Sequence, residues 1–176
     1  GGMGRAIYMA NVLGLDVGMY YKRKDYTRVI NGRNPVVAHE FLGSSVEGKD
    51  MIIIDDMISS GDSALEVAAA LKARKANRIF ICSTFGLFTA GLDRFDKAYE
   101  KGTFDRILTT NLIYQPPELL EREWYINCDL SKYIAYIIDT LNHDSSISDL
   151  LNPVERIHSI VSRYHANGKK NRTESP

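Results

Sequence analysis

The chain has 176 residues, enough for one domain of ordinary size with a buried core. Its 22 Lys and Arg residues balance its 22 Asp and Glu residues, so no bulk charge attracts it to nucleic acid or to an anionic membrane. The hydrophobic fraction of 44% and the charged fraction of 25% are typical of a soluble globular protein. No apolar stretch approaches the ~20 residues of a membrane-spanning helix.

Cysteine usage and the chain start give two further expectations. Cys82 and Cys128 are too few and too far apart for a disulfide framework or a zinc site. They predict buried free thiols, which suit the reducing cytoplasm. The chain opens with Gly-Gly-Met-Gly, so we expect no signal peptide before Gly1 and a fragment or a processed chain.

The first 42 residues predict mixed elements. Residues 5–13 have one apolar face and predict a short helix. Residues 16–21 predict a strand, and residues 36–42 could form another. Between these strands, residues 22–35 are polar and basic and contain Gly and Pro, which predicts a long loop.

Beyond residue 50, the pattern predicts strands that alternate with helices. In chain order these are strand 51–54, helix 62–74, strand 78–84, helix 91–101, strand 106–109, strand 124–128 and helix 131–141. Such alternation predicts a parallel sheet with right-handed crossovers. An amphipathic segment from Asn152 predicts an appendage or an oligomer contact, and the polar residues 168–176 predict disorder.

The segment from Met51 to Ser63 carries the chemical signal. An apolar strand delivers Asp55 and Asp56 to its carboxyl end, where ligands bind in open α/β sheets. A short loop rich in small hydroxylated residues follows, and the next helix then begins. The loop consists of Ser59, Ser60, Gly61, Asp62 and Ser63. Free amides at a helix start bind anions, and carboxylates accept bonds from ribose hydroxyls or hold Mg²⁺. A phosphate and a diol together describe ribose 5-phosphate.

A plainer interpretation competes with this one. Ser59 or Ser60 can cap the helix, and both aspartates can lie solvated at the strand end. The full arrangement favours a phosphate site over that interpretation. The four histidines are scattered and are assigned no metal.

The same segment resembles the loop of type I phosphoribosyltransferase folds that binds phosphoribosyl pyrophosphate (PRPP). Further stretches resemble one branch, the C-terminal domain of ribose-phosphate pyrophosphokinases. The resembling stretches are the opening Gly1 and Gly2 of a pyrophosphate loop, the basic run Lys22, Arg23 and Lys24 of a catalytic flexible loop, residues 82–91, and Thr109-Thr110-Asn111. The resemblance covers roughly residues 1–141.

The resemblance implies an α/β, type I phosphoribosyltransferase-like fold with a twisted parallel sheet flanked by helices. We therefore expect a ribose 5-phosphate-binding domain at 1–142, and the sequence pattern beyond it predicts a helical extension at 143–167 and a disordered tail at 168–176. It implies that Asp55 and Asp56 bind the ribose diol or a metal, that the loop from Ser59 to Ser63 binds the 5-phosphate, and that Mg²⁺ is the cofactor.

The implied reaction moves pyrophosphate from ATP to ribose 5-phosphate and makes PRPP, with Lys22, Arg23 and Lys24 as the catalytic lid. The expected ligands are ribose 5-phosphate, ATP and PRPP. We also expect a cytoplasmic homo-oligomer, with neither nucleic acid nor membrane as partner. ATP binding is assigned to an N-terminal half that lies outside this sequence, so the isolated chain is expected to be inactive.

The chain departs from the family pattern at several positions. Ser59 replaces a third acid, the loop ends in Ser-Gly-Asp-Ser, and Lys24 stands where arginine is usual. The missing third acid keeps a non-catalytic regulatory paralogue open as an alternative. A phosphoribosyltransferase that consumes PRPP also stays open, because the same loop serves both reactions. The basic run can also be no more than a solvated loop.

Overall fold

The computed structural model describes residues 2–24 and 36–173; for residues 22–24, 36–40, 149 and 167–173 it describes the backbone alone. The chain divides into two compact units. The first unit comprises residues 1–7 and 16–128, and the second comprises residues 8–15 and 129–176. The predicted domain boundaries at residues 142 and 167 stay a prediction.

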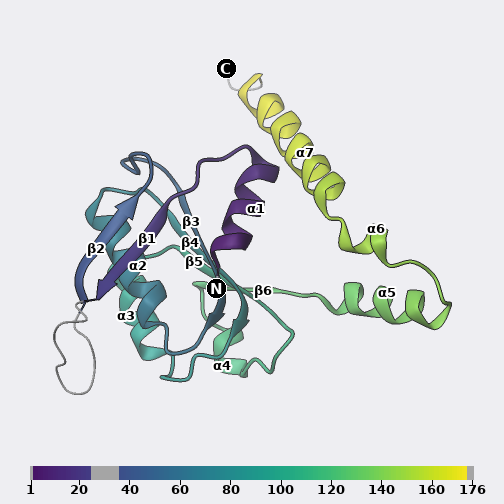
Figure 1. Cartoon of the computed structure of the whole chain (residues 1–176), viewed down its shortest axis with the longest axis horizontal. Coiled ribbons are helices and arrows are strands. Elements are labelled where there is room, and N and C mark those ends of the chain that lie inside the picture. Colours follow the sequence, from purple (N-terminus) through teal and green to yellow (C-terminus); the bar gives the residue numbers. More distant parts are fainter. Residues whose placement is uncertain (1, 25–35, 174–176) are drawn as a thin grey trace. The chain divides into compact units, whose positions relative to one another are not determined.

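The first unit is built on a four-stranded parallel sheet. Its strands β3 (Met51–Ile58), β4 (Ile79–Gly86), β5 (Arg106–Thr110) and β6 (Tyr125–Cys128) lie side by side in chain order. Helices α2 (Asp62–Ala73), α3 (Asp93–Glu100) and α4 (Pro117–Leu120) connect successive strands. The predicted α/β fold with a parallel sheet flanked by helices is thereby confirmed (Figure 1).

The core lies where α2 and α3 meet the sheet. Helix α2 buries Ala64, Ala68 and Leu71, which share one face because they are spaced by four and three residues. Aromatic rings fill the rest of this core. Phe95 stacks on Trp124 with ring centroids 5.7 Å apart, and Phe88 meets Phe95 edge to face at 5.0 Å. Such pairs are stabilising beyond the area they bury.

A separate antiparallel hairpin precedes the sheet. It pairs β1 (Met19–Lys24) with β2 (Val36–Leu42). The prediction that residues 22–35 form a loop is therefore wrong for residues 22–24, which extend the strand: Lys22 pairs with His39 and Lys24 with Val36. The base of the hairpin is attached to the core, since Tyr20 and Phe41 pack against it.

The second unit is helical. It contains α5 (Ser131–Asn142), α6 (Ser148–Leu151) and α7 (Val154–Thr173), together with the end of α1 (Met3–Leu13). Helix α7 continues to Thr173, which differs from the disorder predicted from residue 168. None of the helices in the described part of the chain is both long and apolar enough to span a bilayer.

Candidate functional site

Strand β3 leads into the candidate site without a break. It was predicted to end at Ile54, and instead it runs to Ile58, paired with β4 as far as Gly86. Asp55 and Asp56 therefore lie inside strand β3 and not after its end. Residues 59–63, called here the hydroxyl loop, follow the strand, and helix α2 begins inside the loop at Asp62.

Residues after β4 hold the hydroxyl loop in place. The amide of Leu87 donates to the carbonyl of Ile58 at 2.8 Å, and the amide of Thr89 donates to the carbonyl of Ser59 at 3.0 Å. The hydroxyls of Ser59 and Thr89 lie 3.4 Å apart. The backbone of one βα loop thus fixes the backbone of its neighbour at the same edge of the sheet.

Gly61 is required by the geometry of the loop. Its φ of +85° lies in the left-handed region, which glycine adopts without strain. A Cβ at this position would lie 2.1 Å from the Phe95 ring. The aromatic core therefore abuts the loop directly, and only a residue without a side chain fits between them.

Several donors of the hydroxyl loop have no acceptor in the part of the chain that the structure describes. Among the described residues, none accepts a hydrogen bond from the amides of Ser60, Gly61 or Ser63, or from the hydroxyl of Ser63. Unbonded amides at the start of a helix attract anions, because the helix dipole adds partial positive charge there. The loop can accept a phosphate or a carboxylate.

Asp55 and Asp56 form a coupled pair of carboxyl groups. Burial raises the pKa of Asp55, and the negative charge of Asp56 adds to that effect. A hydrogen bond from the Asp55 side chain holds the pKa of Asp56 below its usual value. Asp55 also accepts the Asp56 amide at 2.9 Å. The two carboxyl groups therefore differ in how readily they lose a proton. Both precede the hydroxyl loop by a few residues in the sequence.

The N-terminal segment lies against this pair. Gly2 is buried, and a Cβ there would lie 2.0 Å from the carbonyl oxygen of Ile54 and 2.8 Å from the Cα of Asp55. Its carbonyl accepts the amide of Ala6 at 2.9 Å, which starts helix α1. The structure therefore brings together Gly2 and Asp55, which are far apart in the sequence. Gly1 lies outside the described residues.

A magnesium ion would find few protein ligands here. Within the described part of the chain, no group of three or more His, Cys, Asp or Glu side chains is close enough to hold a metal. Mg²⁺ is commonly held by one or two carboxylates together with waters and substrate oxygens. Asp55 and Asp56 are compatible with such a site, which stays a prediction.

The side chain of Asp62 faces other residues of the protein. Its carboxylate accepts the Ser60 hydroxyl at 2.8 Å and forms an ion pair with Arg94 of α3. Arg94 also donates to the Ser60 carbonyl at 3.0 Å. Sequence reasoning missed Arg94, Thr89 and Phe95, because no local pattern marks residues that support the loop from other elements.

The basic run predicted to be catalytic lies on the hairpin. Lys22, Arg23 and Lys24 occupy the end of β1, with an irregularity in the pairing between Arg23 and Lys24. Their side chains lie outside the described residues. Their place near the transferring group therefore stays a prediction.

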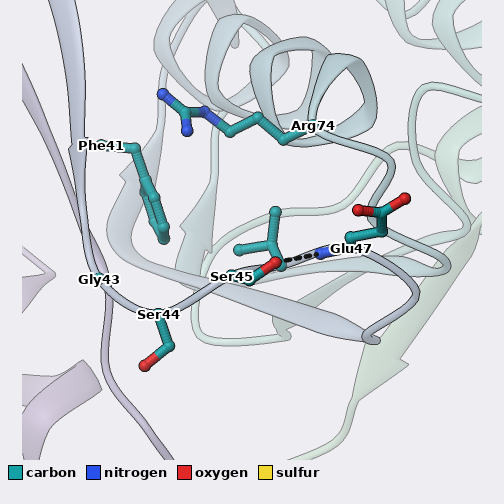
Figure 2. A pocket seen from close by; sticks show the side chains of 7 residues that line it. Phe41, Gly43, Ser44, Ser45, Glu47 and Arg74 are labelled. Atoms are coloured by element: carbon teal, nitrogen blue, oxygen red, sulfur yellow. Dashed lines mark hydrogen bonds between the residues drawn. The ribbon is translucent and has the colours of Figure 1, made fainter.

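A pocket of about 230 Å³ lies elsewhere in the first unit (Figure 2). Phe41, Gly43, Ser44, Ser45, Val46, Glu47 and Arg74 line it. Figure 2 shows Arg74 extending from the end of α2 toward the Phe41 ring, which its guanidinium approaches to 5.3 Å. The Ser45 hydroxyl accepts the Glu47 amide. No lining residue belongs to the hydroxyl loop or to the aspartate pair, so this hollow is not the predicted site.

Both cysteines are free, as predicted. They are partly buried, and burial raises the pKa of the Cys82 thiol to about 11 and also raises that of Cys128. The thiols are therefore protonated and unreactive near neutral pH.

Comparison with known proteins places this geometry in a family. Residues 30–152 match the family described as the phosphoribosyl synthetase-associated domain. The ribose-phosphate pyrophosphokinase of Vibrio cholerae is 30% identical over 153 residues, covering 86% of this chain and 46% of that protein. The orotate phosphoribosyltransferase of Oceanobacillus iheyensis is 33% identical over 98 residues, which are 56% of this chain and 43% of that protein.

A solved structure supports the fold independently. The crystal structure of phosphoribosylpyrophosphate synthetase from Mycobacterium smegmatis aligns with a TM-score of 0.64 at 17% identity, over 81% of this chain and 43% of that one. The chain thus spans less than half the length of the relatives it matches. The match over residues 30–152 shows that the chain belongs to the phosphoribosyl synthetase-associated domain family.

Proposed function

We propose that this chain is the ribose 5-phosphate-binding part of a ribose-phosphate pyrophosphokinase, which transfers pyrophosphate from ATP to ribose 5-phosphate. The observation that carries the proposal is the hydroxyl loop, whose amides at Ser60, Gly61 and Ser63 have no acceptor among the described residues. The similarity to the Vibrio cholerae enzyme supports it, since that enzyme is named for this reaction. The rest of the reaction, ATP binding included, is assigned to a part of the enzyme outside this sequence.

The hydroxyl loop and the aspartate pair bind different parts of ribose 5-phosphate. The amides and the Ser63 hydroxyl bind the 5-phosphate, while Asp55 and Asp56 accept hydrogen bonds from the ribose hydroxyls. Gly2, which lies against Asp55, keeps backbone within reach of the ribose end of the site. Mg²⁺ held by Asp55 and Asp56 would neutralise negative charge on the phosphate groups of the substrates.

A binding measurement on the chain itself tests the loop. Ribose 5-phosphate should shift the amide resonance of Gly61, whereas ribose at equal concentration should not. Ser63→Ala should raise the Kd for ribose 5-phosphate by about tenfold, the scale of a lost hydrogen bond to a charged group. Ser44→Ala is the matched control, because Ser44 is an exposed serine of the other pocket. Absence of any response to ribose 5-phosphate in the wild-type chain would refute the proposal.

The basic run is proposed to act on the group in transfer. If Lys22 contacts the moving pyrophosphoryl group and not bound ribose 5-phosphate, Lys22→Ala in a complete enzyme lowers kcat and leaves KM little changed. A loss of ~10²–10³-fold is the scale for one preorganised electrostatic group. Lys24→Arg should be mild, since arginine also binds phosphate oxygens. An unaffected kcat for Lys22→Ala would remove the basic run from the mechanism. The isolated chain should make no PRPP from ATP.

Two other functions have some support. The match to an orotate phosphoribosyltransferase favours an enzyme that consumes PRPP, because the same loop could serve both reactions. Ser59 in place of a third acid favours a non-catalytic regulatory paralogue. Ribose 5-phosphate binding without turnover in a complete protein would identify the paralogue, and release of pyrophosphate from PRPP with a base would identify the transferase.

A further inference from the structure

The hydroxyl loop already contains an anion of its own. Asp62 is the first residue of α2, and its side chain is well exposed, at 64%. One carboxylate oxygen, Oδ2, accepts the Ser60 hydroxyl at 2.8 Å. The other, Oδ1, accepts the guanidinium of Arg94. A carboxylate at this place is favoured by the positive end of the helix dipole, as a bound phosphate would be.

Asp62 therefore uses donors that a bound phosphate would need. The Ser60 hydroxyl points to this carboxylate and is not directed into an open site. The Arg94 guanidinium is fixed on the loop twice, by the ion pair with Asp62 and by its bond to the Ser60 carbonyl at 3.0 Å. Among the described residues, no acceptor is left for the amides of Ser60, Gly61 and Ser63 or for the Ser63 hydroxyl.

We propose that Asp62 is an internal competitor of the phosphate group and that Arg94 is the cation they share. The inference rests on the proposed role of the hydroxyl loop as a phosphate site. An incoming phosphate lies close to the Asp62 carboxylate, which repels it. When phosphate binds, the carboxylate turns out to solvent and Arg94 donates to the phosphate oxygens instead. Asp62 thereby sets the affinity of the loop for doubly charged phosphate groups.

Removing the charge of Asp62 while keeping its shape is the direct test. Asp62→Asn keeps an oxygen that can accept the Ser60 hydroxyl, so the loop conformation is retained. With the repulsion gone, the Kd for inorganic phosphate and for ribose 5-phosphate should fall about tenfold at low salt. The gain should shrink at high salt, because salt screens the repulsion between the exposed Asp62 carboxylate and the phosphate in the wild type. Asp93→Asn is the matched control, since it removes an exposed carboxylate from the first turn of α3.

Arg94 supplies a second, independent measurement. If Asp62 and phosphate share Arg94, then Arg94→Gln weakens phosphate binding more in the Asp62→Asn background than in the wild type. If Arg94 has only a structural role, Arg94→Gln should weaken phosphate binding by the same factor in both backgrounds. A different factor in the two backgrounds shows that Asp62 and phosphate share Arg94. Lys97→Gln, on the same helix, controls for loss of a positive charge. All variants are compared after thermal unfolding has shown that they fold.

The binding results for the wild type, Asp62→Asn and Asp93→Asn separate the inference from the proposed function. Tighter binding by Asp62→Asn with unchanged binding by Asp93→Asn supports the inference, and binding by the wild type then also supports the proposed function. Binding by Asp62→Asn without detectable binding by the wild type supports the inference about Asp62 and refutes the proposed function. If wild type and Asp62→Asn bind equally, the inference is overturned while the proposed function stands. If neither binds phosphate or ribose 5-phosphate, both are overturned.

Discussion

The units of this chain bury apolar surface in contrasting ways. Every buried hydrophobic side chain among the described residues belongs to the first unit, at positions between Val46 and Tyr125. In the second unit, helix α5 has no buried residue, and Ile134, Ile138 and Leu141 on it are exposed. The hydroxyl loop belongs to the unit that has a core, and Phe95 of that core sets the shape of the loop at Gly61.

This contrast shows what an anion site made of backbone amides requires. Amides can point at an anion only if their carbonyls and neighbours are fixed elsewhere, and the loop gains this from Leu87, Thr89 and Phe95. In the second unit, helix α5 has an amphipathic sequence but buries none of its residues. A candidate site is therefore expected where packing is dense, and the helical unit is expected to open at lower free energy.

The largest expected effect on stability is found by making the same substitution, isoleucine to alanine, once in each unit. Ile107 on β5 is fully buried at 0% exposure, whereas Ile138 on α5 is 62% exposed. Ile107→Ala should lower the free energy of unfolding by about 3–4 kcal/mol, because it leaves a cavity in the sheet core. Ile138→Ala should change it by less than about 0.5 kcal/mol. Urea unfolding followed by Trp124 fluorescence measures the first unit, since Trp124 is the only tryptophan and is buried there.

The control for this pair is helical circular dichroism, which reports the second unit as well. Equal losses for the two variants would contradict the comparison, because they would mean that α5 buries Ile138 as deeply as the sheet buries Ile107.

A smaller effect is expected at the N-terminal segment. Gly2→Ala would place a Cβ 2.0 Å from the Ile54 carbonyl oxygen, so the segment must move away from β3. We expect a loss of about 2 kcal/mol in the free energy of unfolding and faster hydrogen exchange near Asp55. Gly4→Ala is the matched control: nothing lies within 4 Å of its Cβ position, and alanine favours the helix by about 0.5 kcal/mol. A neutral Gly2→Ala would show that the segment does not press on the strand.

Much of the fold could be predicted from the sequence, because its elements carry strong local patterns. Helix α2 was predicted within a residue of its end, since its apolar residues recur on one face. The errors occurred where pairing partners decide the structure. Asp55 and Asp56 do not look like strand residues, yet pairing with β4 carries the strand through them to Ile58. Lys22 belongs to a strand for the same reason, because β2 pairs with it.

The candidate site was less accessible to prediction than the fold. The hydroxyl loop is contiguous in the sequence, so its small residues, its glycine and the following helix were recognisable together. Arg94 and Thr89 reach the loop from about 30 residues away, and no local spacing identifies them. The direction of the Asp62 side chain is also a tertiary fact, because it depends on the Arg94 guanidinium beside it.

The smallest expected effect concerns an ion pair at the far end of strand β3. Asp50 precedes the strand and accepts the Arg78 Nε at 3.1 Å, the Arg78 amide at 3.2 Å and the Asn77 side chain at 2.8 Å. The hydrogen bond from the Arg78 side chain is the main reason that the pKa of Asp50 falls from 3.8 to about 2. A depressed pKa means that the folded state prefers the charged form, so the stabilisation is present above pH 3.8 and is lost as the pH falls toward 2.

Asp50→Asn should therefore be less stable than the wild type at neutral pH, and the gap should close between about pH 4 and pH 2. Denaturant titrations at a series of pH values measure the gap. Asp50 is at the surface, so a small effect that falls with added salt is expected. Repeating the comparison in an Arg78→Gln background is the control, because without the guanidinium the main cause of the shift is gone and the gap should lose its pH dependence. A gap that stays constant down to pH 2 would show that the Asp50 carboxylate is no better stabilised in the folded chain than in the unfolded one.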